Sequence, residues 1–87
     1  MSKSQHQLVK LVYITTCISS LATVGDTMGA LYGEAEIKNL NKGSEVLTPE
    51  RMHALKSAIE SVDILLTALE NDYDSLYGEL EELMKEI

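Results

Sequence analysis

Four acidic residues near the carboxyl end of the chain have the spacing of a calcium-binding loop. Glu70, Asp72, Asp74 and Glu81 stand at positions 1, 3, 5 and 12 of such a loop, where EF-hand proteins place oxygen ligands for Ca²⁺. The position that requires glycine for the sharp turn is occupied by Ser75. Apolar residues continue through this segment at helical spacing. We therefore expect a plain helix here, without bound metal.

The other reactive side chains stand singly along the sequence. His6 and His53 are far apart and have no acidic residues at ligand spacing. Cys17 is the only cysteine, and it lies in an apolar row without a neighbouring base, so we expect a buried, unreactive thiol. No nucleophile–histidine–acid arrangement or metal motif occurs. The sequence therefore predicts a protein that is not an enzyme and needs no cofactor or metal.

A third candidate is the segment GDTMGALYG at residues 25–33, in which Gly25, Gly29 and Gly33 stand four apart. It follows no strand and lacks the lysine of a phosphate-binding loop. Each glycine inside a helix costs about 1 kcal/mol relative to alanine. Three interpretations remain open: close packing of two helices, a kink or break in one helix, or a groove for a small molecule or peptide. We favour close packing, because small residues line the same helix, namely Thr15, Ser19, Ala22, Gly29 and Gly33 beside Gly25.

The second half of the chain predicts one long helix at about residues 49–85. Thr48 can cap it, Pro49 suits the first helical position, and Glu50 complements the positive end of the helix dipole. Apolar residues then alternate at intervals of three and four, which is typical of a coiled-coil seam and requires a partner helix along its length. The seam consists of Met52, Leu55, Ile59, Val62, Leu66, Leu69, Tyr73, Leu76, Leu80, Leu83 and Ile87.

The first half predicts a second long helix at about residues 4–39, with Ser2 or Ser4 as its cap. Its seam is Leu11, Ile14, Ile18, Leu21, Gly25, Met28, Tyr32 and Ala35, with a flanking row of Cys17, Val24 and Leu31. Turn-forming residues, including Gly43, mark a loop at about residues 40–48, which is short enough to return the chain antiparallel. The predicted fold is all-α, an antiparallel helical hairpin forming a single domain over residues 1–87.

Both helices carry more apolar surface than one neighbour can cover. Small and apolar residues widen the seam of the second helix, including Ala58 and Leu65. Helices with such wide faces usually contact two neighbours, and a second copy of the chain is the simplest source of them. We therefore predict a homodimer that forms a four-helix bundle. The residues predicted for its packing interface are Ala22, Gly25, Gly29, Gly33, Ala58 and Leu65.

Charge is distributed unevenly along the 87 residues. The net charge is −7, and all of it arises in residues 48–87, where three basic residues oppose ten acidic ones. Direct binding to nucleic acid is disfavoured by this acidity. The carboxylates near the end either solubilise the protein or form a patch that docks on a basic partner protein. The predicted patch is Glu70, Asp72, Asp74, Glu79, Glu82 and Glu86.

The apolar run LVYITTCISSLATV follows Lys3 and Lys10 and superficially resembles a signal peptide. Its threonines and serines interrupt the run, and its length of about 14 residues is short of the roughly 20 that a membrane-spanning helix needs. The single cysteine weakly favours a reducing compartment. We therefore expect a cytoplasmic protein without membrane contact.

In architecture and length the chain is similar to the small plasmid- and phage-encoded helical hairpins that dimerise into four-helix bundles. This resemblance assigns no functional residue. The function expected from the sequence is that of a small, non-enzymatic interaction or regulatory protein acting as a homodimeric bundle. Two alternatives are an acidic inhibitor of the kind made by phages and mobile elements, which docks on the nucleic-acid-binding surface of a partner, and a chaperone-like clamp around one partner helix.

Overall fold

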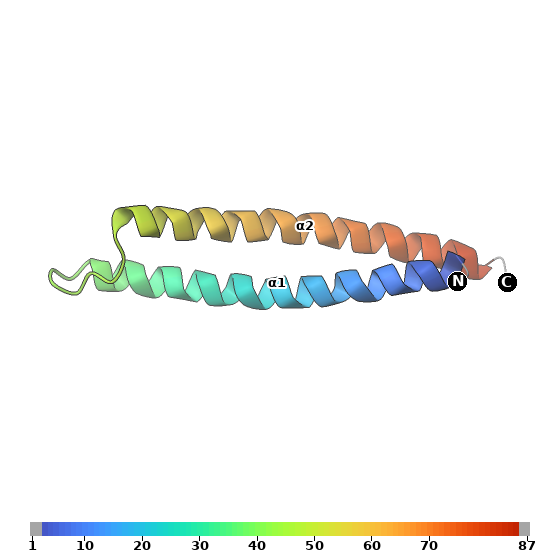
Figure 1. Ribbon diagram of the computed structural model, residues 1–87, viewed down its shortest axis with the longest axis horizontal. Helices are drawn as coiled ribbons and strands as arrows, with labels where there is room; N and C mark the ends of the chain where they lie inside the picture. The colour runs from blue at the N-terminus through green and yellow to red at the C-terminus, as the bar shows by residue number, and fades with distance from the viewer. Residues whose placement is uncertain (1–2, 86–87) are drawn as a thin grey trace.

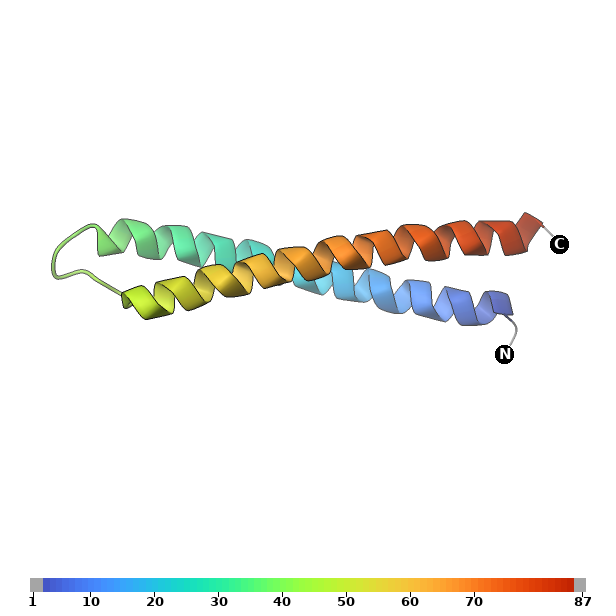
Figure 2. The ribbon, with the colours of Figure 1, turned by 90° about the horizontal axis from the view of Figure 1, so that it is seen from above.

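The computed structural model describes residues 3–85 and consists of two long helices, α1 (Lys3–Asn39) and α2 (Pro49–Lys85). The helices pack antiparallel, so the two ends of the described chain lie at one end of a rod and the connecting loop at the other (Figure 1). The rod measures 67 × 17 × 14 Å. Seen from above, the two helices cross near their middles (Figure 2). The predicted antiparallel hairpin is therefore confirmed.

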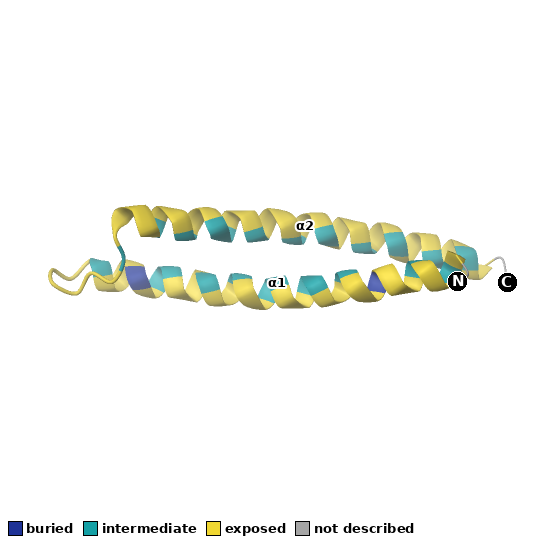
Figure 3. Ribbon diagram, in the orientation of Figure 1, coloured by how far each residue is buried: buried dark blue, intermediate teal, exposed yellow. Residues whose placement is uncertain are grey.

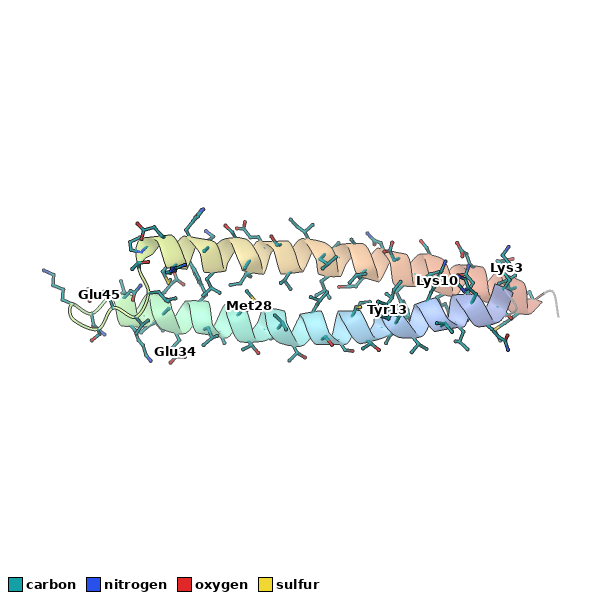
Figure 4. All side chains as sticks on the ribbon, viewed as in Figure 1. Lys3, Lys10, Tyr13, Met28, Glu34 and Glu45 are labelled. Carbon is teal, nitrogen blue, oxygen red and sulfur yellow. The ribbon has the colours of Figure 1, made fainter. Side chains whose placement is uncertain are left out.

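The seams predicted for the two helices face each other. Half-buried positions follow the inner side of both ribbons, and the outer sides are exposed (Figure 3). Every predicted seam residue from 11 to 83 is half-buried or buried; Ile87 lies outside the described residues. Figure 4 shows side chains filling the space between the ribbons. Within residues 3–85, however, only Leu11 and Ala35 are buried, so the hairpin has a thin core.

The start of α2 agrees with its sequence signal. The Thr48 hydroxyl accepts a hydrogen bond from the backbone N–H of Arg51 at 3.2 Å, and the Thr48 carbonyl accepts the first helical bond, from Met52, at 2.9 Å. This is the geometry of an N-cap, in which a side-chain oxygen satisfies one of the free N–H groups of the first turn. Pro49 then occupies the first helical position, where its missing N–H costs nothing.

The two ends of the loop are joined by the side chain of Asn39, a role that the sequence did not indicate. The amide of Asn39 donates to the carbonyl of Leu47 at 3.0 Å and accepts from the N–H of Val46 at 2.8 Å. These two bonds join the last residue of α1 to the residues just before α2. Gly43 lies in the turn, with a φ of 83°, the left-handed conformation that glycine adopts without steric cost.

The glycines of α1 neither end nor interrupt it, because the helix continues through Gly25, Gly29 and Gly33 to Asn39. Only Gly25 stands close to α2: a Cβ atom built there would lie 3.5 Å from the Cγ1 atom of Val62. Cβ atoms built at Gly29 or Gly33 would meet nothing within 4 Å. At 3.5 Å a methyl group at Gly25 would make ordinary van der Waals contact with Val62, so packing inside the hairpin does not require glycine at any of the three positions.

Candidate interaction surfaces

Two packed helices have two flanks, one on each side of their common seam. In helices that pack through a coiled-coil seam, residues seven apart lie in one row along the same side. Surface grooves identify which rows of α1 and α2 adjoin each other. At the end that carries the termini, one groove brings Lys3 of α1 beside Glu79 of α2. At the loop end, another joins Leu31 of α1 to Leu55 of α2.

The first flank is apolar and uncharged over its central part. Lys3 and Leu31 belong to the same seven-residue row of α1, and Glu79 belongs to the corresponding row of α2. Between the charged ends of these rows lie five residues that we call the uncharged flank: Cys17, Val24, Leu31, Ala58 and Leu65. Val24, Leu31 and Leu65 are 45%, 53% and 48% exposed. The next rows outward are also uncharged here, with Ser20, Thr27, Ser61 and Ala68.

The second flank combines small residues on α1 with carboxylates on α2. One groove on this side is lined by Thr15 and Ser19 of α1 together with Glu70, Tyr73 and Asp74 of α2. The next groove along the rod brings Ala22, Gly25 and Asp26 beside the carboxylates of Glu60 and Asp63. We call Glu60, Asp63, Glu70 and Asp74, with the small residues opposite them, the acidic flank.

The acidic flank becomes apolar toward the termini. The same rows continue there with four exposed apolar side chains: Leu8, Val12, Tyr77 and Met84. Tyr77 stacks on Tyr73, which lines the first groove, with ring centroids 6.1 Å apart. One side of the rod therefore carries carboxylates in its middle and an apolar end.

The residues predicted for the dimer interface do not share one surface. Ala22, Gly29 and Gly33 belong to the rows of the acidic flank, whereas Ala58 and Leu65 belong to the uncharged flank; Gly25 lies in the seam between them. These residues share small size or nearness to the seam, but not one side of the rod. The seven-residue spacing that joins Ala58 to Leu65, and Ala22 to Gly29, was the signal that could have separated them.

The predicted acidic patch is also divided. Glu70 and Asp74 line a groove on the acidic flank, whereas Glu79 and Glu82 line the groove near Lys3 on the opposite side. Asp72 belongs to the same seven-residue row as Glu79. Glu86 lies outside the described residues. Sequence reasoning missed Glu60 and Asp63, although they continue the rows of Asp74 and Glu70 toward the loop.

The residues considered for catalysis or metal binding remain scattered. His6 and His53 are exposed on different helices, and Cys17 is half-buried rather than buried. In residues 3–85 no group of three or more histidine, cysteine or acidic side chains comes together in a way that could hold a metal ion. The segment at residues 70–81, which has the spacing of a calcium-binding loop but is predicted to be helical, is continuous helix within α2.

Helix α1 is unusually free of charge on all of its sides. Between Lys10 and Glu34 its only charged residue is Asp26. Three threonine hydroxyls on it bond to carbonyls one turn earlier, at 2.8 to 3.1 Å, so they need no other partner: Thr15 to Leu11, Thr16 to Val12 and Thr23 to Ser19. Helices that are apolar all round usually lie in a protein core or a membrane.

By length and composition alone, α1 could cross a membrane, and only 6% of its most apolar 18-residue window is buried in the hairpin. Core helices of soluble proteins and signal sequences pass the same test, and α1 lies near the amino end of the chain. Helix α1 therefore combines the apolar composition of such helices with little burial against α2.

Comparisons with protein-family models, with curated proteins and with solved structures found no match to this chain.

Proposed function

We propose that the chain is a small, non-enzymatic interaction protein that works as a homodimeric helical bundle. The observation that carries this proposal is the thin core: α1 has 37 residues and a single charged residue between Lys10 and Glu34, yet only Leu11 and Ala35 are buried. Two hairpins that pack together would cover this surface with the helices of a four-helix bundle. The bundle would then present its remaining surface to other proteins.

The seam of α2 favours an aqueous, cytoplasmic bundle over a membrane-spanning α1. Residues of this seam from Met52 to Leu83 are half-buried against α1. If α1 crossed a bilayer alone, α2 would lose its only partner within the chain and would expose a continuous apolar stripe to water. Burial of apolar surface on both helices is retained only when they stay paired.

The experiment that tests this proposal is a mass measurement in solution. Light scattering at micromolar concentration should return twice the chain mass of 9.6 kDa. A mass of one chain across the micromolar range would overturn the homodimer. The same sample should show a largely helical circular dichroism spectrum, which establishes that the measured species is folded.

The acidic flank supports a second candidate function, docking on a basic partner protein such as one that binds nucleic acid. Its carboxylates lie along two successive grooves, opposite small residues that would allow another helix to approach. A lysine-rich amphipathic peptide serves as the probe. Its binding should weaken steeply as salt rises from 50 to 500 mM, because exposed charge pairs are screened.

A pair of variants assigns that binding to one flank. Asp63→Asn with Glu70→Gln should weaken peptide binding at low salt. Glu79→Gln with Glu82→Gln removes the same number of charges from the other side of the rod and should have a smaller effect. Equal losses from both pairs would indicate attraction by net charge alone, without a docking surface.

A further inference from the structure

We propose that the second copy of the chain binds to the uncharged flank, and that the acidic flank stays exposed in the dimer. This inference rests on the proposed homodimer and names its interface. Three properties of the hairpin favour a second copy at this position: its exposed area, the exposed side chains of the two flanks, and the charges that a second copy would bring to each flank.

The exposed area of one chain is large enough to form a dimer interface. A compact protein of this mass would expose about 5,100 Å², whereas the hairpin exposes 6517 Å². The excess of roughly 1,400 Å² exceeds the ~800 Å² that each partner buries in an interface of standard size. The radius of gyration, 19.2 Å against about 12 Å for a globular chain of this length, reflects the same lack of a third layer.

The uncharged flank has the composition of an interface core. Val24, Leu31 and Leu65 are about half-exposed without any partner in the hairpin that covers them. The rows around them carry alanine, serine and threonine, whose short side chains allow helices to approach closely. On α1 the rows of the uncharged flank carry no charge from Tyr13 to Leu31, a length of about 27 Å. A second hairpin laid along it would cover these side chains with the same kind of surface.

Charge opposes dimerisation through the acidic flank. A second copy on the acidic flank would bring Glu60, Asp63, Glu70 and Asp74 against carboxylates of the partner, and like charges placed together oppose association. Lys56 is the one lysine or arginine in those rows of α2. The ends of the uncharged flank instead carry both signs, with Lys10, Lys38 and Arg51 as well as Asp72 and Glu79.

Neighbouring residues provide the test. Leu65 lies on the uncharged flank and is 48% exposed. Ile64, the preceding residue, lies on the outer side of α2 and is 71% exposed. We expect Leu65→Lys to raise the dissociation constant of the dimer at least tenfold, measured by sedimentation equilibrium. Ile64→Lys adds the same charge and should leave it within about twofold of the wild type. Circular dichroism checks that both variants keep their helical content.

A second matched pair covers the case in which Leu65→Lys fails to fold. Val24→Lys should dissociate the dimer, and Thr23→Lys, one residue away on the outer side of α1, should not. Ser19→Lys probes the acidic flank. If Ser19→Lys dissociates the dimer while Val24→Lys and Leu65→Lys leave it intact, the interface assignment is wrong although the homodimer stands.

The native thiol gives a readout that needs no substitution at the interface. Cys17 belongs to the uncharged flank, so its alkylation should slow at least fivefold when the chain concentration rises from below to above the dissociation constant. In a Cys17→Ser, Thr23→Cys variant the thiol should react at the same rate at both concentrations. Equal rates for Cys17 at both concentrations would overturn the assignment. So would a wild-type chain that floats with phosphatidylcholine vesicles as a monomer, since lipid would then be the occupant.

Discussion

At the scale of single residues, the three glycines of α1 have different surroundings although their spacing is regular. Gly25 faces Val62 across the seam, at a distance that a methyl group would fill with ordinary van der Waals contact, whereas a side chain at Gly29 or Gly33 would meet open space. The cost of about 1 kcal/mol per helical glycine is therefore not explained by packing inside the hairpin at any of the three positions. These glycines are either unexplained or used in a contact outside the hairpin.

We expect Gly29→Ala to stabilise the protein by about 0.5–1 kcal/mol, because alanine has the higher helix propensity and meets no neighbour. Urea unfolding monitored by circular dichroism measures the change. Gly29→Leu distinguishes the two explanations: an exposed site tolerates leucine, whereas a site inside a dimer interface would lose stability. A loss on Gly29→Leu would also count against the uncharged flank as the interface.

Gly43, in the turn, differs from the helical glycines, because its backbone conformation restricts substitution although there is room for a side chain. Gly43 has a φ of 83° and nothing within 4 Å of a built Cβ atom. We expect Gly43→Ala to destabilise the hairpin by about 1 kcal/mol, since an L-residue pays this much for the left-handed region. Gly43→Asn, which tolerates that region, should restore part of the loss in the same unfolding assay.

At the scale of the elements, the capping residues decide where each helix begins and ends. The Thr48 hydroxyl bonds to the N–H of Arg51 at the start of α2. Thr48→Ala should cost about 1 kcal/mol of stability and Thr48→Ser much less, because serine keeps the hydroxyl. Asn39→Ala removes two bonds that bridge the loop and should cost a comparable amount. An alanine variant that unfolds at the same midpoint as the wild type would contradict the role of the residue it replaces.

The seam itself can be tested with two leucines one turn apart on α1. Leu11 is 9% exposed and Leu8 is 49% exposed. Leu11→Ala should cost about 2–3 kcal/mol, since it removes a buried side chain and leaves a cavity, whereas Leu8→Ala should cost less than about 1 kcal/mol. Similar losses at both positions would mean that Leu8 is covered as well, by a contact that one hairpin does not contain.

The helices were predictable from the sequence because their signals are local and repeat many times. Ten apolar residues at three- and four-residue intervals, from Met52 to Leu83, define the α2 seam, and Thr48-Pro49-Glu50 marks the start of the helix. The bonds from Asn39 to Val46 and Leu47 were not predictable, since they depend on how the loop closes. The division of the small and acidic residues between two flanks depends on helical phase, which the seven-residue rows encode but residue type does not.

At the scale of the whole molecule, the two helices differ in the charge of their surfaces and in how much apolar surface they leave uncovered. Helix α2 is amphipathic: its seam packs on α1 and its remaining surface is rich in carboxylates. Helix α1 has one charged residue, Asp26, between Lys10 and Glu34, and it packs on α2 along only one side. Helix α2 therefore keeps the molecule soluble, and α1 has more apolar surface than one neighbouring helix covers. The proposed dimerisation through the uncharged flank would cover one more side of α1 and leave the carboxylates of the acidic flank in water.

The proposed dimer would make the stability of the protein depend on the concentration of the chain. If the dimer is the folded species, mass action adds free energy as the chain concentration rises above the dissociation constant, about 1.4 kcal/mol for each tenfold increase. Thermal unfolding should therefore shift to higher temperature between 1 and 100 μM wild-type protein. Leu65→Lys, if it dissociates the dimer, should unfold at one temperature over the same range, whereas Ile64→Lys should keep the wild-type dependence. A midpoint that is independent of concentration for all three proteins would mean that the lone hairpin is stable with its apolar flank exposed, and the bundle proposal would then have no energetic basis.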